Sequence, residues 1–243
     1  MGVGVDAVSK TDALTKLLGF LGEDRLHTLF TPNPEFILEA QNDREFAEVL
    51  NKGDLVVPDG IGVVLASRLT DVKIKERVAG CDLIMALFNA IKDTDESVYL
   101  FGGKPGVAEL AKENMQKKYP GLKIAGCSDG YFDVKKERLI IHEIQRLRPA
   151  VLLVGIGFPN QEKWIYRHRH RLPVRIAAGI GGSIDVMAGT AARAPAFMRK
   201  IGLEWFWRLL RQPSRIKRMY KLPWFLIKAV IARFSNYANV TKP

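Results

Sequence analysis

The chain has 243 residues, 47% of them hydrophobic, which is enough for one large domain with an ordinary core plus an appendage. Its net charge of +11 is carried entirely by residues 193–243, where twelve Lys and Arg side chains accompany a single acid, Glu204. The longest apolar stretch, 224–234, contains Lys228 and Arg233 and falls short of the ~20 residues that a membrane-spanning helix needs. No signal peptide is visible, so we expect a cytoplasmic protein whose membrane contact is peripheral.

Segments typical of strands alternate with segments typical of helices through most of the chain. The expected strands are 26–30, 54–57, 97–101, 122–127, 150–156 and 174–180. The expected helices include 80–92, 105–119, 135–147 and 159–171. This alternation predicts an α/β fold with a mostly parallel sheet and helices on both faces. A further strand near residues 2–7 is only just present in the pattern.

Each expected strand is followed by a polar or glycine-rich cluster. In chain order these clusters are Thr31-Pro32-Asn33-Pro34, Pro58-Asp59-Gly60, Gly102-Gly103-Lys104-Pro105, Ser128-Asp129-Gly130-Tyr131, Gly157-Phe158-Pro159-Asn160-Gln161 and Gly181-Gly182-Ser183-Ile184-Asp185. Because ligands of open α/β sheets bind beyond the carboxyl ends of the strands, six such clusters predict one large site. Turn formation alone would explain the Gly, Pro and Asn residues, but it does not require Asp59, Gln161 or Asp185.

Asp59 follows the apolar run 55–57, at the expected end of a strand. A carboxylate placed there is a candidate general base for a substrate hydroxyl. The alternative is that Asp59 caps a helix beginning near Ile61. The sequence favours neither interpretation.

Gly102, Gly103 and Lys104 precede Pro105 and a helical pattern. Proline suits the first turn of a helix, and free N–H groups there would favour an anion such as a diphosphate. The segment is neither a Walker loop nor a complete GxGxxG motif.

Two other residues have plain structural alternatives. Gln161 stands in the first turn of an expected helix, where a surface position is the simpler interpretation. Tyr131 is a candidate for stacking on a nucleobase, and the alternative is a half-buried ring packed beside the sheet.

We expect no metal and no cofactor. Asp93-Thr94-Asp95 has the DxD form of many metal-dependent glycosyltransferases, but it precedes an expected strand and so falls on the opposite edge of the sheet. His168 and His170 are two residues apart on an expected helix, and such residues point in different directions. Cys81 and Cys127 lie far apart and show no metal or redox spacing.

The tail combines cations with aromatic and aliphatic side chains. Arg208, Arg211, Arg215 and Arg218 recur at helical spacing, and arginine is well shaped for phosphate. The segment 224–234 is nearly all apolar and predicts an interfacial helix on an anionic membrane surface. Self-association into a homo-oligomer is the alternative use of that apolar side.

These motifs together resemble the WecG/TagA/CpsF glycosyltransferase family over nearly the whole chain. The matching segments of the body are Thr31-Pro32-Asn33-Pro34-Glu35, Pro58-Asp59-Gly60, Arg77-Val78-Ala79-Gly80, Gly102-Gly103-Lys104-Pro105, Asp129-Gly130-Tyr131-Phe132, Pro159-Asn160-Gln161-Glu162-Lys163, Gly181-Gly182 and Arg193-Ala194-Pro195. Those of the tail are Gly202-Leu203-Glu204-Trp205, Arg208-Leu209-Leu210 and Gln212-Pro213-Ser214-Arg215-Ile216-Lys217-Arg218.

The resemblance implies a Rossmann-like catalytic domain, residues 1–195, followed by a basic helical membrane-association appendage, residues 196–243. It implies an inverting, metal-independent transfer of N-acetylmannosamine from UDP-N-acetylmannosamine to undecaprenyl-diphosphate-linked N-acetylglucosamine, in a β-1,4 linkage of wall teichoic acid. Asp59 is then the implied base. The implied substrate contacts are Thr31, Asn33, Arg77 and Gln161 for sugar and diphosphate, Tyr131 and Asp185 for the nucleotide, and Arg208, Arg215 and Arg218 from the tail.

Two alternatives stay open from the sequence. The donor sugar is not specified by motifs that bind UDP and diphosphate, so UDP-N-acetylmannosaminuronic acid or another UDP-hexose, for enterobacterial common antigen or a capsular polysaccharide, is an alternative. A nucleic-acid-binding protein with a basic tail is an alternative of another class. It leaves Asp59 and the six clusters unexplained, so we expect no nucleic-acid partner.

Overall fold

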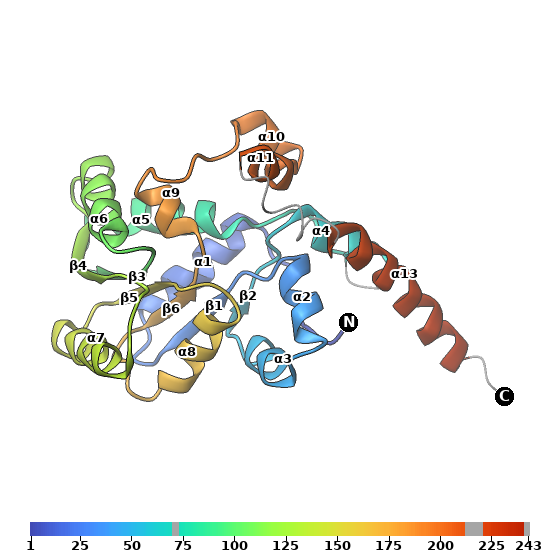
Figure 1. Ribbon diagram of the computed structural model, residues 1–243, viewed down its shortest axis with the longest axis horizontal. Helices are drawn as coiled ribbons and strands as arrows, with labels where there is room; N and C mark the ends of the chain where they lie inside the picture. The colour runs from blue at the N-terminus through green and yellow to red at the C-terminus, as the bar shows by residue number, and fades with distance from the viewer. Residues whose placement is uncertain (70–72, 212–220, 241–243) are drawn as a thin grey trace.

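The computed structural model describes residues 1–69, 73–211 and 221–240 (Figure 1). Its strands are β1 His27–Phe30, β2 Leu55–Val56, β3 Ser97–Gly102, β4 Lys123–Ser128, β5 Val151–Gly155 and β6 Ile176–Gly179. Its helices are α1 Lys10–Leu21, α2 Pro34–Ala40, α3 Arg44–Asn51, α4 Ile61–Ser67, α5 Gly80–Ile91, α6 Val107–Lys118, α7 Val134–Leu147, α8 Asn160–His168, α9 Ser183–Met187, α10 Ala196–Lys200, α11 Glu204–Arg211 and α13 Lys221–Val240. The six predicted strands and the four predicted helices are all present, with ends within a few residues of those expected.

The strands form one sheet in the order β2-β1-β6-β5-β3-β4, and every neighbouring pair is parallel. The predicted α/β fold is therefore confirmed. Residues 2–7 were expected to be marginally strand-like and are not a strand. The Asp6 N–H donates to the Val56 carbonyl at 2.8 Å, but the Val56 N–H donates to the Asp6 carboxylate instead of a backbone carbonyl, so no ladder continues.

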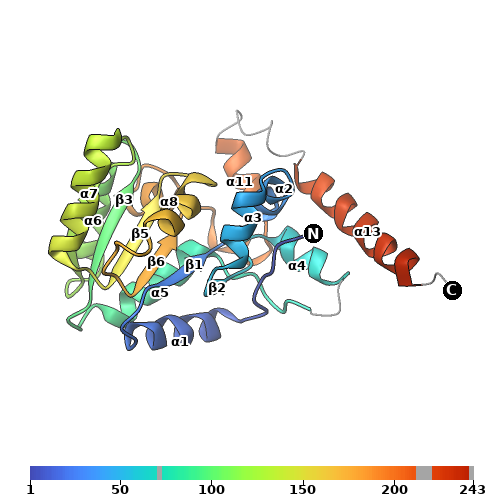
Figure 2. The same ribbon diagram turned by 90° about the horizontal axis from the view of Figure 1, so that it is seen from below.

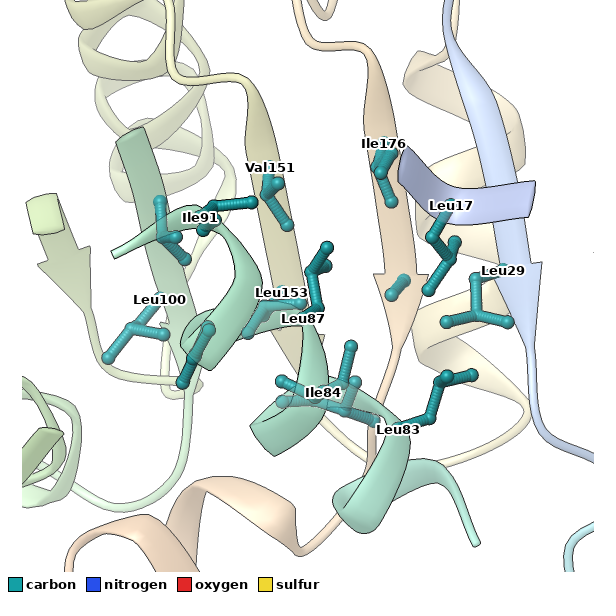
Figure 3. Packing of buried hydrophobic residues seen from close by; sticks show 14 of the residues in the cluster. Leu17, Leu29, Leu83, Ile84, Leu87, Ile91, Leu100, Val151, Leu153 and Ile176 are labelled. Carbon is teal, nitrogen blue, oxygen red and sulfur yellow. The ribbon is translucent and has the colours of Figure 1, made fainter. Parts of the chain in front are cut away.

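Helices α1, α5, α6 and α9 cover one face of the sheet (Figure 1). On α5, Leu83, Ile84, Leu87 and Ile91 recur at helical spacing and point onto the strands, as Figure 3 shows. All four are buried, and burial of each side chain contributes about 1.5–3 kcal/mol. This packing anchors α5 along its length and fixes its first residue, Gly80, at the edge where the strands end.

Helices α2, α3, α7 and α8 cover the opposite face. Side chains alternate along the strands, so Leu100 of β3 packs toward α5 while its neighbour Phe101 packs toward α8. The rings of Phe101 and Trp164 of α8 have centroids 5.0 Å apart. Because both faces are covered, the strands are apolar almost throughout, as expected for a parallel sheet.

The C-terminal helices lie outside these two layers. Figure 2 shows α13 leading away from the sheet, and its first half packs against α2 and α4. Phe225 and Ala229 are buried there, beside Ile37 of α2 and Val63 of α4. Among the side chains of α13 that the structure describes, the exposed large apolar ones are Trp224, Ile227, Val230 and Ile231.

Among the described residues, no helix is long and apolar enough to cross a membrane.

Candidate functional site

All the predicted clusters lie at one edge of the sheet, because every strand is parallel. The chain leaves β5 toward the face that carries α8, and it leaves the neighbours of β5, β3 and β6, toward the face that carries α6 and α9. Connections that leave adjacent strands on opposite faces mark the place where α/β proteins bind ligands. The topology therefore supports a site beyond β3, β5 and β6.

Glycines bring four loops into backbone contact at this place. The Gly103 N–H donates to the Gly155 carbonyl at 3.2 Å, and the Gly130 N–H donates to the Gly103 carbonyl at 2.8 Å. A side-chain carbon on Gly102 would lie 2.3 Å from the Gly155 oxygen, and one on Gly155 would lie 2.7 Å from the Gly181 oxygen. We call these five residues the glycine junction. At the glycine junction the surface consists of backbone groups, because none of the five residues has a side chain.

Lys104 and Tyr131 stand beside the glycine junction. Both are exposed, and the Tyr131 side chain is among the most exposed large apolar groups, at 62%. The half-buried alternative for Tyr131 is therefore wrong. The Tyr131 N–H donates to Asp129 at 2.9 Å, and Lys136 donates both to Asp129 and to the Tyr131 carbonyl. These bonds fix the backbone of the loop, while the Tyr131 ring faces solvent.

The helix expected from Pro105 begins two residues later. Gly106 is the N-cap of α6, with φ at 83°, and its position makes no side-chain capping bond. Pro105 instead lies in the turn that leads into the helix.

A second group of predicted residues gathers beyond β1 and β2. One Asp59 carboxylate oxygen accepts from the Gly80 N–H at 3.3 Å, and the Asp59 N–H donates to the Pro32 carbonyl at 3.1 Å. A side-chain carbon on Gly80 would lie 2.9 Å from the Thr31 methyl carbon. Thr31, Asp59 and the first turn of α5 are therefore in close contact, although they come from three separate segments.

The capping alternative for Asp59 is not what the structure shows. Gly60 is the N-cap of α4 and makes no side-chain capping bond. Asn33, in contrast, does cap a helix: its side-chain oxygen accepts from the N–H groups of Glu35, at 2.8 Å, and Phe36, at 3.3 Å. The oxygen of Asn33 is thus occupied in starting α2.

Gln161 is buried, with 1% exposure, so the surface interpretation of this residue is wrong. Its side-chain oxygen accepts from the Gly181 N–H at 3.0 Å, and its amide nitrogen donates to Glu162 at 2.6 Å. Gln161 therefore joins the start of α8 to the loop after β6. Asp185 lies half-buried in the first turn of α9, and its backbone carbonyl accepts from Thr190 at 3.1 Å.

Ion pairs connect the tail to this second group. Arg77 pairs with Glu204 of α11 at 3.1 Å, and both side chains are largely buried. Asp82, in the first turn of α5, pairs with Arg193 at 2.8 Å and with Arg199 at 3.3 Å. Burial alone would raise the pKa of Asp82, but the hydrogen bond and charge of Arg193 hold that pKa below its ordinary value.

Three arginines of the predicted site are not placed with the others. Arg208 belongs to α11, and the structure does not describe its side chain. Arg215 and Arg218 lie outside the described residues. Their expected contacts stay predictions.

No group of three or more metal-ligating side chains occurs in the part of the chain that the structure describes. Asp93-Thr94-Asp95 lies between α5 and β3, on the edge opposite to the site, and Asp95 pairs with Lys123 at 2.6 Å. His168 is placed 3.1 Å from Glu137 in a bond across two helices.

Sequence reasoning gave no role to Asp82, Glu162 or Glu204. A signal existed for Glu204, because it is the one acid in a strongly basic tail. Glu162 stood inside a matching motif but looked like an ordinary first-turn acid. Only the fold shows that it is buried.

Sequence comparisons identify the family of the chain. The family described as "Glycosyl transferase WecG/TagA/CpsF family" matches residues 1–239. A relative from Bacillus subtilis (strain 168) is 39% identical over 213 residues, which cover 88% of this chain and 82% of the relative. A relative from Staphylococcus aureus (strain MRSA252) is 31% identical over 235 residues, which cover 96% and 92%. Both relatives are named N-acetylglucosaminyldiphosphoundecaprenol N-acetyl-beta-D-mannosaminyltransferase. With matches of this extent, the chain belongs to the WecG/TagA/CpsF family and is a glycosyltransferase.

Proposed function

We propose that this enzyme transfers N-acetylmannosamine from UDP-N-acetylmannosamine to undecaprenyl-diphosphate-linked N-acetylglucosamine, with inversion to a β-1,4 linkage, in wall teichoic acid synthesis. The names of the relatives from Bacillus and Staphylococcus support the acceptor and the transferred sugar. The observation that carries the mechanism is the position of Asp59, beyond the end of β2 and against the first turn of α5.

In this mechanism Asp59 is the general base. Its carboxylate takes the proton of the acceptor 4-hydroxyl while that oxygen forms a bond to the anomeric carbon of the donor. The bond from the anomeric carbon to the diphosphate breaks, and its electron pair leaves with UDP from the opposite face. The hydrogen bond from Gly80 orients the carboxylate, and Thr31 closes the same side of the site.

The donor nucleotide would lie at the glycine junction. The start of α6 follows Gly102 and Gly103 and has no side-chain cap, so the positive end of this helix would favour a diphosphate there. Lys104 supplies a cation at the start of α6, and the exposed ring of Tyr131 supplies a stacking surface for uracil. Gln161 and Asp185 belong to the α8 and α9 starts that flank this place.

Negative charge that develops on the leaving UDP needs fixed positive charge near it. We propose Arg77 as one such cation: it is paired with Glu204, and the N–H of the next residue, Val78, donates to the Pro58 carbonyl beside Asp59. We propose Arg208, Arg215 and Arg218 as further cations from the tail. Supplying them from the tail would restrict hydrolysis of the donor when no acceptor is present, because the site is complete only with the tail in place.

We propose that residues 196–243 form the appendage that holds the enzyme on the inner face of the cell membrane, next to its lipid acceptor. Exposed apolar side chains of this segment support the proposal. They are Phe197, Ile201, Phe206, Leu210, Trp224, Ile227, Val230 and Ile231. The excess of cations in the same segment would attract anionic lipid headgroups.

The test is UDP release from UDP-N-acetylmannosamine in EDTA, with and without the lipid-linked acceptor. We expect release only with acceptor, and loss of about 10²–10⁴ in kcat for Asp59→Asn with unchanged UDP affinity, because the amide cannot accept the proton. Release by wild type only from a UDP-hexuronic acid or another UDP-hexose would replace the proposed donor. An Asp59→Asn enzyme that keeps most of its turnover would refute Asp59 as the base.

A further inference from the structure

Glu162 is a fully buried acid at the start of α8, with 0% exposure. One carboxylate oxygen accepts from the Gln161 side-chain nitrogen at 2.6 Å. The other oxygen is also buried, and among the described residues it has no hydrogen-bond partner. Burial of a carboxyl group with half of its bonding capacity unused is costly. An ordinary core position would be filled by an apolar side chain at lower cost, so this acid calls for an explanation.

The sheet makes room for this pair of side chains. A side-chain carbon on Gly179, the last residue of β6, would lie 2.6 Å from the Glu162 oxygen and 3.0 Å from the Gln161 amide nitrogen. Any other residue at position 179 would push both groups away. The carboxyl and carboxamide groups are thus held directly against the backbone at the end of β6.

From there the connection continues to the loop after β6. The Gln161 side-chain oxygen accepts from the Gly181 N–H at 3.0 Å, so its amide group bridges Glu162 and that loop. Gly181 has a positive φ of 50°, and its carbonyl lies close to Gly155 of the glycine junction. The position of the Gly181 backbone, and of the α9 start beyond it, therefore depends on which way the Gln161 amide faces.

We propose that Glu162 is a positioning residue of the transfer reaction, which holds the Gln161 carboxamide in one orientation and so fixes the loop after β6 against the donor. This inference rests on the proposed function, in which the donor lies at the glycine junction. Glu162 acts through Gln161 and Gly181. It has no contact of its own with the reacting atoms.

The protonation state of Glu162 gives this role a measurable signature. Burial is the main cause that raises the pKa of Glu162 to about 7, against the lowering effect of the Gln161 hydrogen bond. Of the elements packed against α8, strands β5 and β6 contain no titratable residue. The charged groups of α3 and its cap are engaged elsewhere: Arg44 pairs with Glu48, and Asp43 and Glu45 pair with Lys163. From α7, Glu137 accepts from Trp164 and lies 3.1 Å from His168. The ionised carboxylate accepts a stronger bond than the neutral acid. Donor binding should therefore tighten as pH rises through about 7.

The test compares Glu162→Gln, which keeps an accepting oxygen, with Glu162→Leu, which removes it at similar size. We expect Glu162→Leu to raise the donor KM about tenfold with little change in kcat, which is the loss expected for one buried hydrogen bond. Glu162→Gln should rescue the KM but lose its pH dependence. Gly179→Ala leaves Glu162 and Gln161 unchanged but places a methyl group against both of them. It should raise the donor KM as Glu162→Leu does. Glu113→Gln, on the exposed side of α6, is the matched control.

UDP affinity measured by calorimetry between pH 6 and pH 8 separates this inference from the proposed function. If no transfer is found but UDP affinity follows the pattern above, the proposed reaction fails, and what stands is that Glu162 positions the loop after β6 at the nucleotide site. A Glu162→Leu protein with wild-type KM and UDP affinity would overturn the inference, as would a pH dependence that persists unchanged in Glu162→Gln. If Glu162→Leu does not fold, the Gly179→Ala protein decides by the same criteria.

Discussion

Replacement of Glu162 by glutamine should change how the stability of the protein depends on pH. A pKa raised from 4.5 to about 7 means that the folded state holds a proton that the unfolded state has released across this interval. The wild-type protein should therefore lose stability as pH rises from 4.5 to about 7, by about 3 kcal/mol, since each pKa unit is worth ~1.4 kcal/mol. Glu162→Gln cannot titrate and should not show this loss.

The assay is urea unfolding of both proteins at a series of pH values on either side of this interval. The difference in unfolding free energy between variant and wild type should grow in favour of the variant by about 3 kcal/mol from the acid to the alkaline end. Any constant cost of the substitution cancels in this comparison, and Glu113→Gln, on the exposed side of α6, is the matched control. A flat difference for Glu162→Gln would mean that the carboxyl group is hydrated, and the reasoning from burial would be refuted.

Two further substitutions test the glycine junction and the tail. Gly102→Ala should lower the unfolding free energy by about 2–4 kcal/mol and weaken UDP binding, because the new carbon would lie 2.3 Å from the Gly155 oxygen and because residue 102 has a φ of 144°. Urea unfolding measures the first effect and calorimetry the second. A variant with unchanged stability and UDP affinity would exclude the close approach. Phe225→Ala should weaken the docking of α13 on α2 and α4 by about 3 kcal/mol. We expect a protease to remove the tail faster from the variant than from wild type, with no change in unfolding of the sheet. Equal cleavage rates for the two proteins would contradict this packing.

The fold could be predicted because its signals are local. The alternation of apolar strands with amphipathic helices sets the class, and right-handed connections limit the topology. The edge that holds the site followed from the same pattern, since parallel strands all end on one side. Residues 2–7 show the limit of such reasoning: their pattern hints at a strand, but Asp6 binds Val56 with its side chain and ends the ladder.

The chemistry of individual residues was harder to predict, because it depends on long-range contacts. Nothing near Asp59 in the sequence shows that its partner is Gly80, the first residue of α5, instead of α4, the helix that starts beside it. Gln161 looked exposed because first-turn residues usually are. It is buried because Gly179, at the end of β6, and Gly181, in the loop after β6, lie against its side chain. The exposure of Tyr131 likewise depends on where its loop stands relative to the glycine junction.

The first turn of α5 joins the proposed base to the tail. The positive end of the helix dipole there favours negative charge, which Asp59, bonded to the Gly80 N–H, and Asp82 supply. Two carboxylates at one helix end would repel each other without nearby cations, and Arg193 and Arg199 provide these for Asp82. Arg77, just before the helix, is paired with Glu204, the single acid of the basic tail. The tail therefore contributes both signs of charge around α5, and this explains why an otherwise basic segment retains one buried acid.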